Sequence, residues 1–498
     1  MSDSKISNFI KGSAILVLAN MMIKAINFFL LPLYTKYLTP TELGISDSIT
    51  NVTAILMPIL MLGLDSAFSA FYFDERTEEH KSKVFNTSLI TLIVAGITPF
   101  IIAIFSKDIS LWLFNTEKHQ ILVAVSLITI SFNLWYTPYA LHARMENRML
   151  LFAAVNVSAS LLMIASNIVF VSVMQLGAFA LILSSALVQL FQLLAYLVFL
   201  PKLFKYKEYD KALLHRMLKY SIPLIPTAIA AWFLNLSDRY FLLHYFSAAE
   251  VGIYGIGARF SSLLSVLSNA VFTAYTTFAF DKKDDEDAKH QYKRVLSFYY
   301  MILMIICIIV TMWGKEIIEL MSNSAYGAAY LLLPGLLFGQ VMYGVSVIVG
   351  YGLSFTKRTN YILAANVIGA LLNIVLNILL IPSFGPEAAA YTTYIGYFVM
   401  AILLYVFGQK FYPCDYGIVK LIISNVGVIG LASFMNHYEM GLGLRALLTI
   451  ATFALMSIFY RAAIKDIFVI FRRIKRKIKN GKRKSVSIIL AENSKKSR

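Results

Sequence analysis

Charged residues are scarce in this chain: they make up 14% of its 498 residues, against about 25% in an ordinary soluble domain. Cysteine is scarcer still. Cys307 and Cys414 alone offer no disulfide framework and no paired metal-ligand spacing. The seven histidines show no ligand spacing, and the HExxH and GxxxxGKS/T motifs are absent. We therefore expect no enzyme and no cofactor, and any driving force would be an H+ or Na+ gradient, the membrane potential or substrate flux.

Long apolar runs dominate what is present. Hydrophobic residues make up 59% of the chain, and runs of about 20 residues, enough to cross about 30 Å of hydrocarbon as a helix, recur along it. The alternating pattern of a β-barrel is absent. The sequence predicts an all-α polytopic membrane protein with about fourteen transmembrane helices. The expected spans are 9–35, 43–73, 84–106, 118–141, 149–173, 177–200, 217–245, 249–280, 294–313, 327–353, 360–381, 385–408, 417–436 and 442–464.

The loops between these spans differ in basic residues. One alternate set carries nearly all the lysines and arginines, whereas the other holds only Lys36, Lys107, Lys315 and Arg445. The positive-inside rule places the first set in the cytoplasm, with both termini inside. The net charge of +17 therefore indicates an anionic leaflet as partner rather than nucleic acid.

An internal repeat runs through the chain. Residues 37–45 read YLTPTELGI, and residues 245–253, an offset of 208, read YFSAAEVGI. Six crossings separate the two segments, so the halves start on the same side as parallel repeats, an arrangement that builds two lobes around a central site in secondary transporters. Further matches are Asn156 with Asn366, Asn167 with Asn377, and Gly177 with Gly385.

The repeat leads to a domain prediction. We expect two pseudo-symmetric six-helix lobes, the N-terminal one at 1–200 and the C-terminal one at 201–410, then two extra helices at 411–464. A basic cytoplasmic tail follows at 465–498. Apolar residues interleave with its lysines and arginines at near-helical spacing, which is typical of an amphipathic helix on anionic membrane lipids.

Six ionisable residues fall inside the expected spans, where each costs roughly 2.5–3.5 kcal/mol on insertion scales. We interpret the cations as an electropositive cavity for an anionic group such as a phosphate. The aspartates are then counter-ions or coupling sites, and simple ion pairing is the alternative. The cations are Lys24, Arg239 and Arg259, and the anions are Asp47, Asp65 and Asp238.

Asparagines follow one face of a later span. Asn366, Asn373 and Asn377 are spaced at i, i+7 and i+11. Packing between helices is the usual role of such amides. We also consider Asn373 and Asn377 as candidates to line a sugar path.

Three segments resemble the Wzx-type O-antigen flippases, the polysaccharide exporter branch of the multidrug/oligosaccharidyl-lipid/polysaccharide exporter superfamily. They read LYTKYLTPTELG at 33–44, LSDRYFLLHYFSAAEVGIY at 236–254 and NIVLNILLIPSFG at 373–385. The chain departs from the family pattern after Gly385, where Pro386 and Glu387 replace the usual glycine-alanine pair.

The resemblance implies an alternating-access flippase. It would move polyprenyl-pyrophosphate-linked oligosaccharide from the cytoplasmic to the outer leaflet of the bacterial inner membrane, for O-antigen and other surface polysaccharide. The pyrophosphate would lie on Lys24, Arg239 or Arg259. A glycan polymerase and a chain-length regulator are further partners that the resemblance suggests. A cation-coupled multidrug antiporter, a lipid II flippase and a membrane glycan polymerase remain as alternatives.

Overall fold

The computed structural model describes residues 28–461 and 464, except 76, 147, 284 and 439. All regular elements in this part of the chain are helices. Those of the first half are α2 (Leu31–Tyr37), α3 (Pro40–Ala54), α4 (Leu56–Leu60), α5 (Leu64–Phe71), α6 (Glu78–Ala95), α7 (Thr98–Ile104), α8 (Ser106–Phe114), α9 (Gln120–Met145), α10 (Met149–Asn167), η1 (Ile168–Val173), α11 (Ala178–Phe199) and η2 (Tyr206–Glu208).

The second half of the chain contains the remaining helices. They are α12 (Lys211–Ser221), η3 (Ile222–Leu224), α13 (Ile225–Tyr245), α14 (Ala248–Lys282), α15 (Ala288–Met312), α16 (Gly314–Met321), η4 (Ser324–Leu332), α17 (Leu333–Phe355), α18 (Thr359–Phe411), α19 (Ile418–His437) and α20 (Leu442–Phe459).

The predicted fold class is confirmed. Within the described residues, 12 helices are long and apolar enough to cross a membrane. One of them, the 53-residue α18, changes direction at the non-helical Gly385 and covers two expected spans. The twelve helices therefore account for every expected span after the first. The span at 9–35 and the tail at 465–498 lie largely or wholly outside the described residues.

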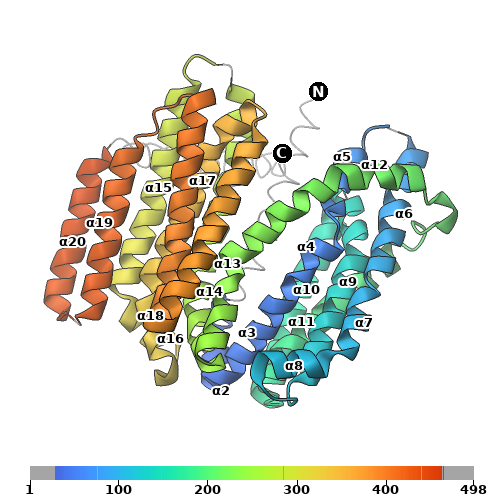
Figure 1. Ribbon diagram of the computed structural model, residues 1–498, viewed down its shortest axis with the longest axis horizontal. Coiled ribbons are helices and arrows are strands. Elements are labelled where there is room, and N and C mark those ends of the chain that lie inside the picture. The colour runs from blue at the N-terminus through green and yellow to red at the C-terminus, as the bar shows by residue number, and fades with distance from the viewer. Residues whose placement is uncertain are drawn as a thin grey trace, which may run out of the picture.

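The helices form two bundles, each with its own apolar core (Figure 1). The first bundle comprises α3 to α11, and the second comprises α14 to α20. The helix that follows α11 and η2, α12, still packs on the first bundle. Leu213 and Met217 of α12 belong to the first core, and Ser221 Oγ donates to the Leu62 carbonyl at 2.7 Å. α13 then crosses to the second bundle and packs against α18. The predicted division at 200 and 410 stays a prediction.

The repeated segments form a reciprocal contact between α3 and α14. A Cβ built on Gly44 would lie 1.6 Å from the Ala248 carbonyl oxygen, and one on Gly252 would lie 2.0 Å from the Pro40 carbonyl oxygen. Pro40 and Ala248 are themselves 208 residues apart. The two helices thus cross backbone to backbone about a local two-fold relation, which explains why glycine recurs at this position.

Two further glycines of the repeat share an unusual backbone conformation. Gly177 has φ 58° and ψ −138°, and Gly385 has φ 65° and ψ −148°. This region of φ and ψ is essentially restricted to glycine. Gly177 connects the span that contains Asn156 and Asn167 to the next span, and Gly385 does the same for the span that contains Asn366 and Asn377. The same turn therefore occurs in both halves of the chain.

Gly385→Ala tests this conformational requirement. The nearest atom to a new Cβ is on the Phe246 ring at 3.5 Å, which is ordinary contact. The cost would therefore come from the backbone, about 1–3 kcal/mol of unfolding free energy. We expect a lower melting temperature in detergent than for the wild type. Gly427→Ala in α19, where a Cβ would meet nothing within 4 Å, is the control and should cause no loss.

Candidate functional site

A cavity of about 340 Å³ lies between the two bundles, and we call it the central cavity. Its walls come from α2, α3, α10 and α11 on one side and from α13 and α14 on the other. The side chains that line it are mostly polar, although all these helices except the short α2 belong to membrane spans. Polar side chains facing inward at membrane depth are typical of a substrate path.

Arg259 and Asp47 form an ion pair on the wall of the central cavity. The two guanidinium nitrogens Nη1 and Nη2 lie 3.3 Å from Oδ2 and Oδ1 of Asp47. Both side chains remain partly exposed, 16% for Arg259 and 19% for Asp47. Gly255 makes room for this pair, since a Cβ there would lie 2.3 Å from Asp47 Oδ2. The ring of Tyr34 lies 5.7 Å from the Arg259 guanidinium carbon.

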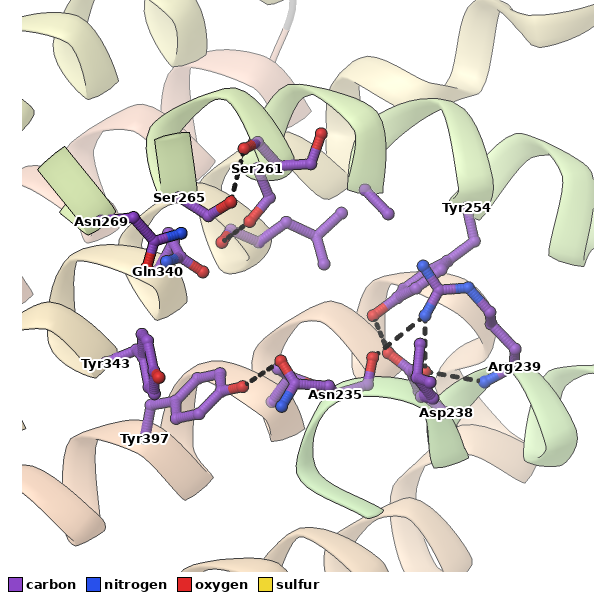
Figure 2. A pocket seen from close by; sticks show the side chains of 15 residues that line it. Asn235, Asp238, Arg239, Tyr254, Ser261, Ser265, Asn269, Gln340, Tyr343 and Tyr397 are labelled. Atoms are coloured by element: carbon purple, nitrogen blue, oxygen red, sulfur yellow. Dashed lines mark hydrogen bonds and ion pairs between the residues drawn. The ribbon is translucent and has the colours of Figure 1, made fainter. Parts of the chain in front are cut away.

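A second cavity of about 360 Å³ lies within the second bundle, between α13, α14, α17 and α18, and we call it the second-bundle cavity. Arg239, Ala258 and Ser262 line both this cavity and the central one, so the two adjoin. Figure 2 shows Asp238, Arg239 and Tyr254 gathered at one end. Arg239 Nη1 lies 3.4 Å from Asp238 Oδ1, and the Tyr254 hydroxyl donates to Asp238 Oδ2.

A third cavity, of about 150 Å³, lies within the first bundle between α3, α4, α9 and α11. We call it the first-bundle cavity. It repeats part of the second-bundle cavity, because six of its lining residues have a counterpart there at an offset of 208. The pairs are Thr50 with Ala258, Thr53 with Ser261, Ala54 with Ser262, Met57 with Ser265, Ser185 with Thr393, and Gln189 with Tyr397. Thr50 and Ser185 also line the central cavity, so polar cavities extend from one bundle to the other.

The structure brings together four of the predicted charged residues. Arg239, Arg259 and Asp47 line the central cavity, and Asp238 lies directly behind Arg239. Of the charged side chains that line the central cavity, two are arginines and one is an aspartate, and Asp238 pairs with Arg239 from behind. Each arginine lies beside a carboxylate that offsets the cost of its burial, which matches the ion-pairing alternative, and the electropositive cavity stays a prediction. Lys24, the third predicted cation, lies outside the described residues.

Asp65 does not lie where the sequence suggested. It is exposed, in the first turn of α5, rather than buried at mid-span. The helix is interrupted just before it, since Leu62 and Gly63 both have positive φ. α5 then packs against α12 rather than along the central cavity. The expectation of a buried aspartate here is wrong, and its role as a counter-ion to Lys24 stays a prediction.

Asn373 and Asn377 lie within helix packing rather than on a cavity wall. Both are fully buried. Asn377 Nδ2 donates to Asn373 Oδ1 at 3.2 Å, and the Thr392 hydroxyl donates to Asn377 Oδ1. Asn373 Nδ2 lies 3.5 Å from Thr393 Oγ1, which lines the second-bundle cavity. The amides support that wall from behind, which matches the packing alternative, and direct contact with a sugar stays a prediction.

Several cavity residues escaped the sequence reasoning because they carry no charge. Ser262, Ser265 and Asn269 line the second-bundle cavity and follow Arg259 on α14 at i+3, i+6 and i+10. This polar stripe on one face of a spanning helix was the signal that could have found them. Gln340 and Tyr343 on α17 stand alone between apolar neighbours, so only their position in the fold identifies them.

Comparison with known families decides the assignment. The family described as "Polysaccharide biosynthesis protein" matches residues 9–280, more than half of the chain. The chain belongs to this family. The family described as MatE also matches, over residues 223–379, which include α13, α14 and the start of α18.

Relatives of this polysaccharide biosynthesis family member are distant in sequence. An uncharacterized membrane protein of Methanocaldococcus jannaschii is 21% identical, over 79% of this chain and 82% of its own length. A probable low-salt glycan biosynthesis flippase of Haloferax volcanii is 25% identical, over 38% of this chain and 40% of its own length. With its apolar helices, the chain is a multi-pass membrane protein.

Solved structures share the fold of this family member. The lipid II flippase MurJ in an inward closed conformation superposes with a TM-score of 0.70 at 16% identity, covering 90% of this chain and 99% of that one. An inward-facing multidrug resistance transporter of the MATE family gives a TM-score of 0.58 at 14% identity, covering 78% and 97%. At these sequence identities the structural similarity establishes the fold. The substrate has to be inferred from the residues of the candidate site.

Proposed function

We propose that this protein is an alternating-access flippase. It moves polyprenyl-pyrophosphate-linked oligosaccharide from the cytoplasmic to the outer leaflet of the bacterial inner membrane, for surface polysaccharide such as O-antigen, with both termini in the cytoplasm. Membership of the polysaccharide biosynthesis family supports the pathway. The shared fold with MurJ, whose name states that it flips lipid II, supports the type of transport.

The observation that carries the proposal is Arg259 in the wall of the central cavity. A guanidinium has five N–H donors in a fixed fork that matches phosphate oxygens. Asp47 takes two of them, through Nη1 and Nη2, at 3.3 Å. The other donors are available to a pyrophosphate in the cavity, and Arg239 on the adjoining wall supplies a second guanidinium. Asp47 then holds Arg259 in place when the cavity is empty.

Contacts at one end of the molecule support alternating access. The α3–α14 crossing lies beside a set of bonds between the first half of the chain and the second bundle. The Tyr326 hydroxyl donates to the Leu38 carbonyl at 3.1 Å, and Thr35 Oγ1 donates to the Met321 carbonyl at 3.0 Å. The distribution of loop charges supports the outer side for this end. We infer a closed outer gate, with Asp238 and Asp47 as candidates for coupling to H+ or Na+.

Reconstitution tests the proposed substrate class. Vesicles containing the full chain should expose a polyprenyl pyrophosphate that carries N-acetylglucosamine units to a membrane-impermeant lectin faster than protein-free vesicles do. Ethidium efflux, measured in the same vesicles, tests the drug antiporter alternative. Lectin access no faster than in protein-free vesicles, with or without ethidium transport, would contradict the flippase.

A further inference from the structure

The second-bundle cavity has two chemically different ends (Figure 2). Asp238, Arg239 and Tyr254 make the charged end, which adjoins the central cavity through Arg239 and Ser262. Asn269, Gln340, Tyr343 and Tyr397 make the other end, and none of them carries a charge. An occupant of the whole cavity would therefore be anionic at one end and neutral and polar at the other.

The neutral end presents hydrogen-bonding groups that the protein itself leaves free. Among the described residues, the side-chain amides of Asn269 and Gln340 and the hydroxyl of Tyr343 have no protein partner, although all three line the cavity. The Tyr397 hydroxyl is used, since it donates to Asn235 Oδ1 at 2.6 Å. Free amides that both donate and accept are suited to hydroxyl groups, which do the same.

Two tyrosine rings form an apolar surface beside these amides. The ring centroids of Tyr343 and Tyr397 lie 5.3 Å apart, with their planes inclined at 59°. Tyrosine combines an apolar ring with a polar tip, and a pyranose likewise combines C–H faces with hydroxyl edges. Aromatic rings, amides and the absence of charge together match a neutral sugar.

The distance from the neutral end to the arginines suits a short chain of sugars. Arg259 and Asn269 are ten residues apart on α14, about 15 Å along the helix axis. Ser262 and Ser265 lie between them on the cavity wall. A short chain of sugars joined to a pyrophosphate at the arginines would extend along this wall to Gln340 and Asn269.

We propose that the neutral end of the second-bundle cavity is a glycan subsite, which binds the sugars that follow the pyrophosphate of the lipid-linked substrate. This inference rests on the proposed function and assigns the sugar to one bundle. The first-bundle cavity is less suited. It is smaller, none of the described residues that line it is aromatic, and its amides are paired, since Asn133 Nδ2 donates to Gln189 Oε1 at 3.3 Å.

The test measures binding of two probes to the full chain in detergent. One is a polyprenyl pyrophosphate, and the other is the same lipid carrying three N-acetylglucosamine units. The wild type should bind the glycosylated lipid more tightly. The double variant Gln340→Ala and Asn269→Ala should weaken that binding about tenfold and leave the affinity for the bare lipid unchanged. Gln189→Ala, which removes an amide from the first-bundle cavity, should alter neither affinity.

The outcomes separate this inference from the proposed function. Equal affinity of the wild type for both lipids, or a double variant that keeps the preference, overturns the glycan subsite alone. A double variant that loses both affinities equally also overturns it, because the residues would then shape the cavity as a whole. A wild type that binds neither lipid overturns the proposed function and this inference with it. Tyr343→Phe, which keeps the ring, should retain most of the preference, whereas Tyr343→Ala should not.

Discussion

Arg259→Gln is expected to weaken binding of polyprenyl pyrophosphate about 10- to 100-fold, because a hydrogen bond to a charged group contributes about 1.5–3 kcal/mol. Flipping should fall by at least as much. Asp47→Asn should act in the opposite direction on binding. It removes the carboxylate that takes two donors of the Arg259 guanidinium, so the whole fork becomes available to phosphate and affinity for the lipid should rise.

The opposite signs distinguish a substrate contact from a structural ion pair. If the pair only stabilises the fold, both variants should lower the melting temperature and weaken lipid binding together. Titration with the bare polyprenyl pyrophosphate, followed by a thermal melt of the same samples, measures both quantities. Arg259→Lys is the graded control, since lysine keeps the charge and loses the fork. Equal losses in Arg259→Gln and Asp47→Asn would remove Arg259 from the binding site.

Gly252→Leu is expected to push α3 away from α14 and destabilise the closed outer contact. A Cβ at Gly252 would already lie 2.0 Å from the Pro40 carbonyl oxygen, and the obstacle is backbone that cannot rotate away. Overpacking of this kind costs about 1–3 kcal/mol, which lowers the population of the closed arrangement about 5- to 150-fold. Transport should fall because one of two alternating states is lost.

Crosslinking across the contact measures this loss. Cysteines introduced at Thr35 and Asn323, which are in contact across the closed outer end, should crosslink readily in the wild-type background and much less when Gly252→Leu is added. Cys307 and Cys414 are buried in this structure, so their interference should be small. Gly443→Leu is the matched control, since a Cβ there would meet nothing within 4 Å. Unchanged crosslinking in Gly252→Leu would show that the glycines are not needed for close approach.

Sequence reasoning succeeded where one local property decides the outcome. Apolar length predicted the helices, because a bilayer requires about 20 apolar residues per span regardless of what surrounds them. The repeat at an offset of 208 predicted that Gly44 and Gly252 are equivalent, and the structure places them in contact with each other's helices. It did not indicate that α12 would pack on the first bundle, since the apolar face of α12 fits either neighbour.

Charge in the sequence marked residues that lie at the candidate site, but it did not indicate how they pair. Arg239, Arg259, Asp47 and Asp238 were all singled out, because ionisable groups inside spans are rare and costly. Their pairing depends on which helices face each other: Asp47 and Arg259 are 212 residues apart, and no spacing rule connects them. Asp65 was misplaced for the same reason, since only the break at Leu62 and Gly63 moves it away from the cavity.

The sequence by itself therefore determines the membrane-spanning helices and the positions of the charged residues in them. The reason is that the free energy of transfer into lipid depends on each segment's own residues. The division of the polar interior into a charged and a neutral end arises from tertiary structure. Gln340, Tyr343 and Tyr397 come from helices distant in sequence from Asn269, and they share a cavity only because α14, α17 and α18 pack together. An uncharged polar residue adds little to the free energy of inserting a helix into the membrane, so it does not stand out in the sequence.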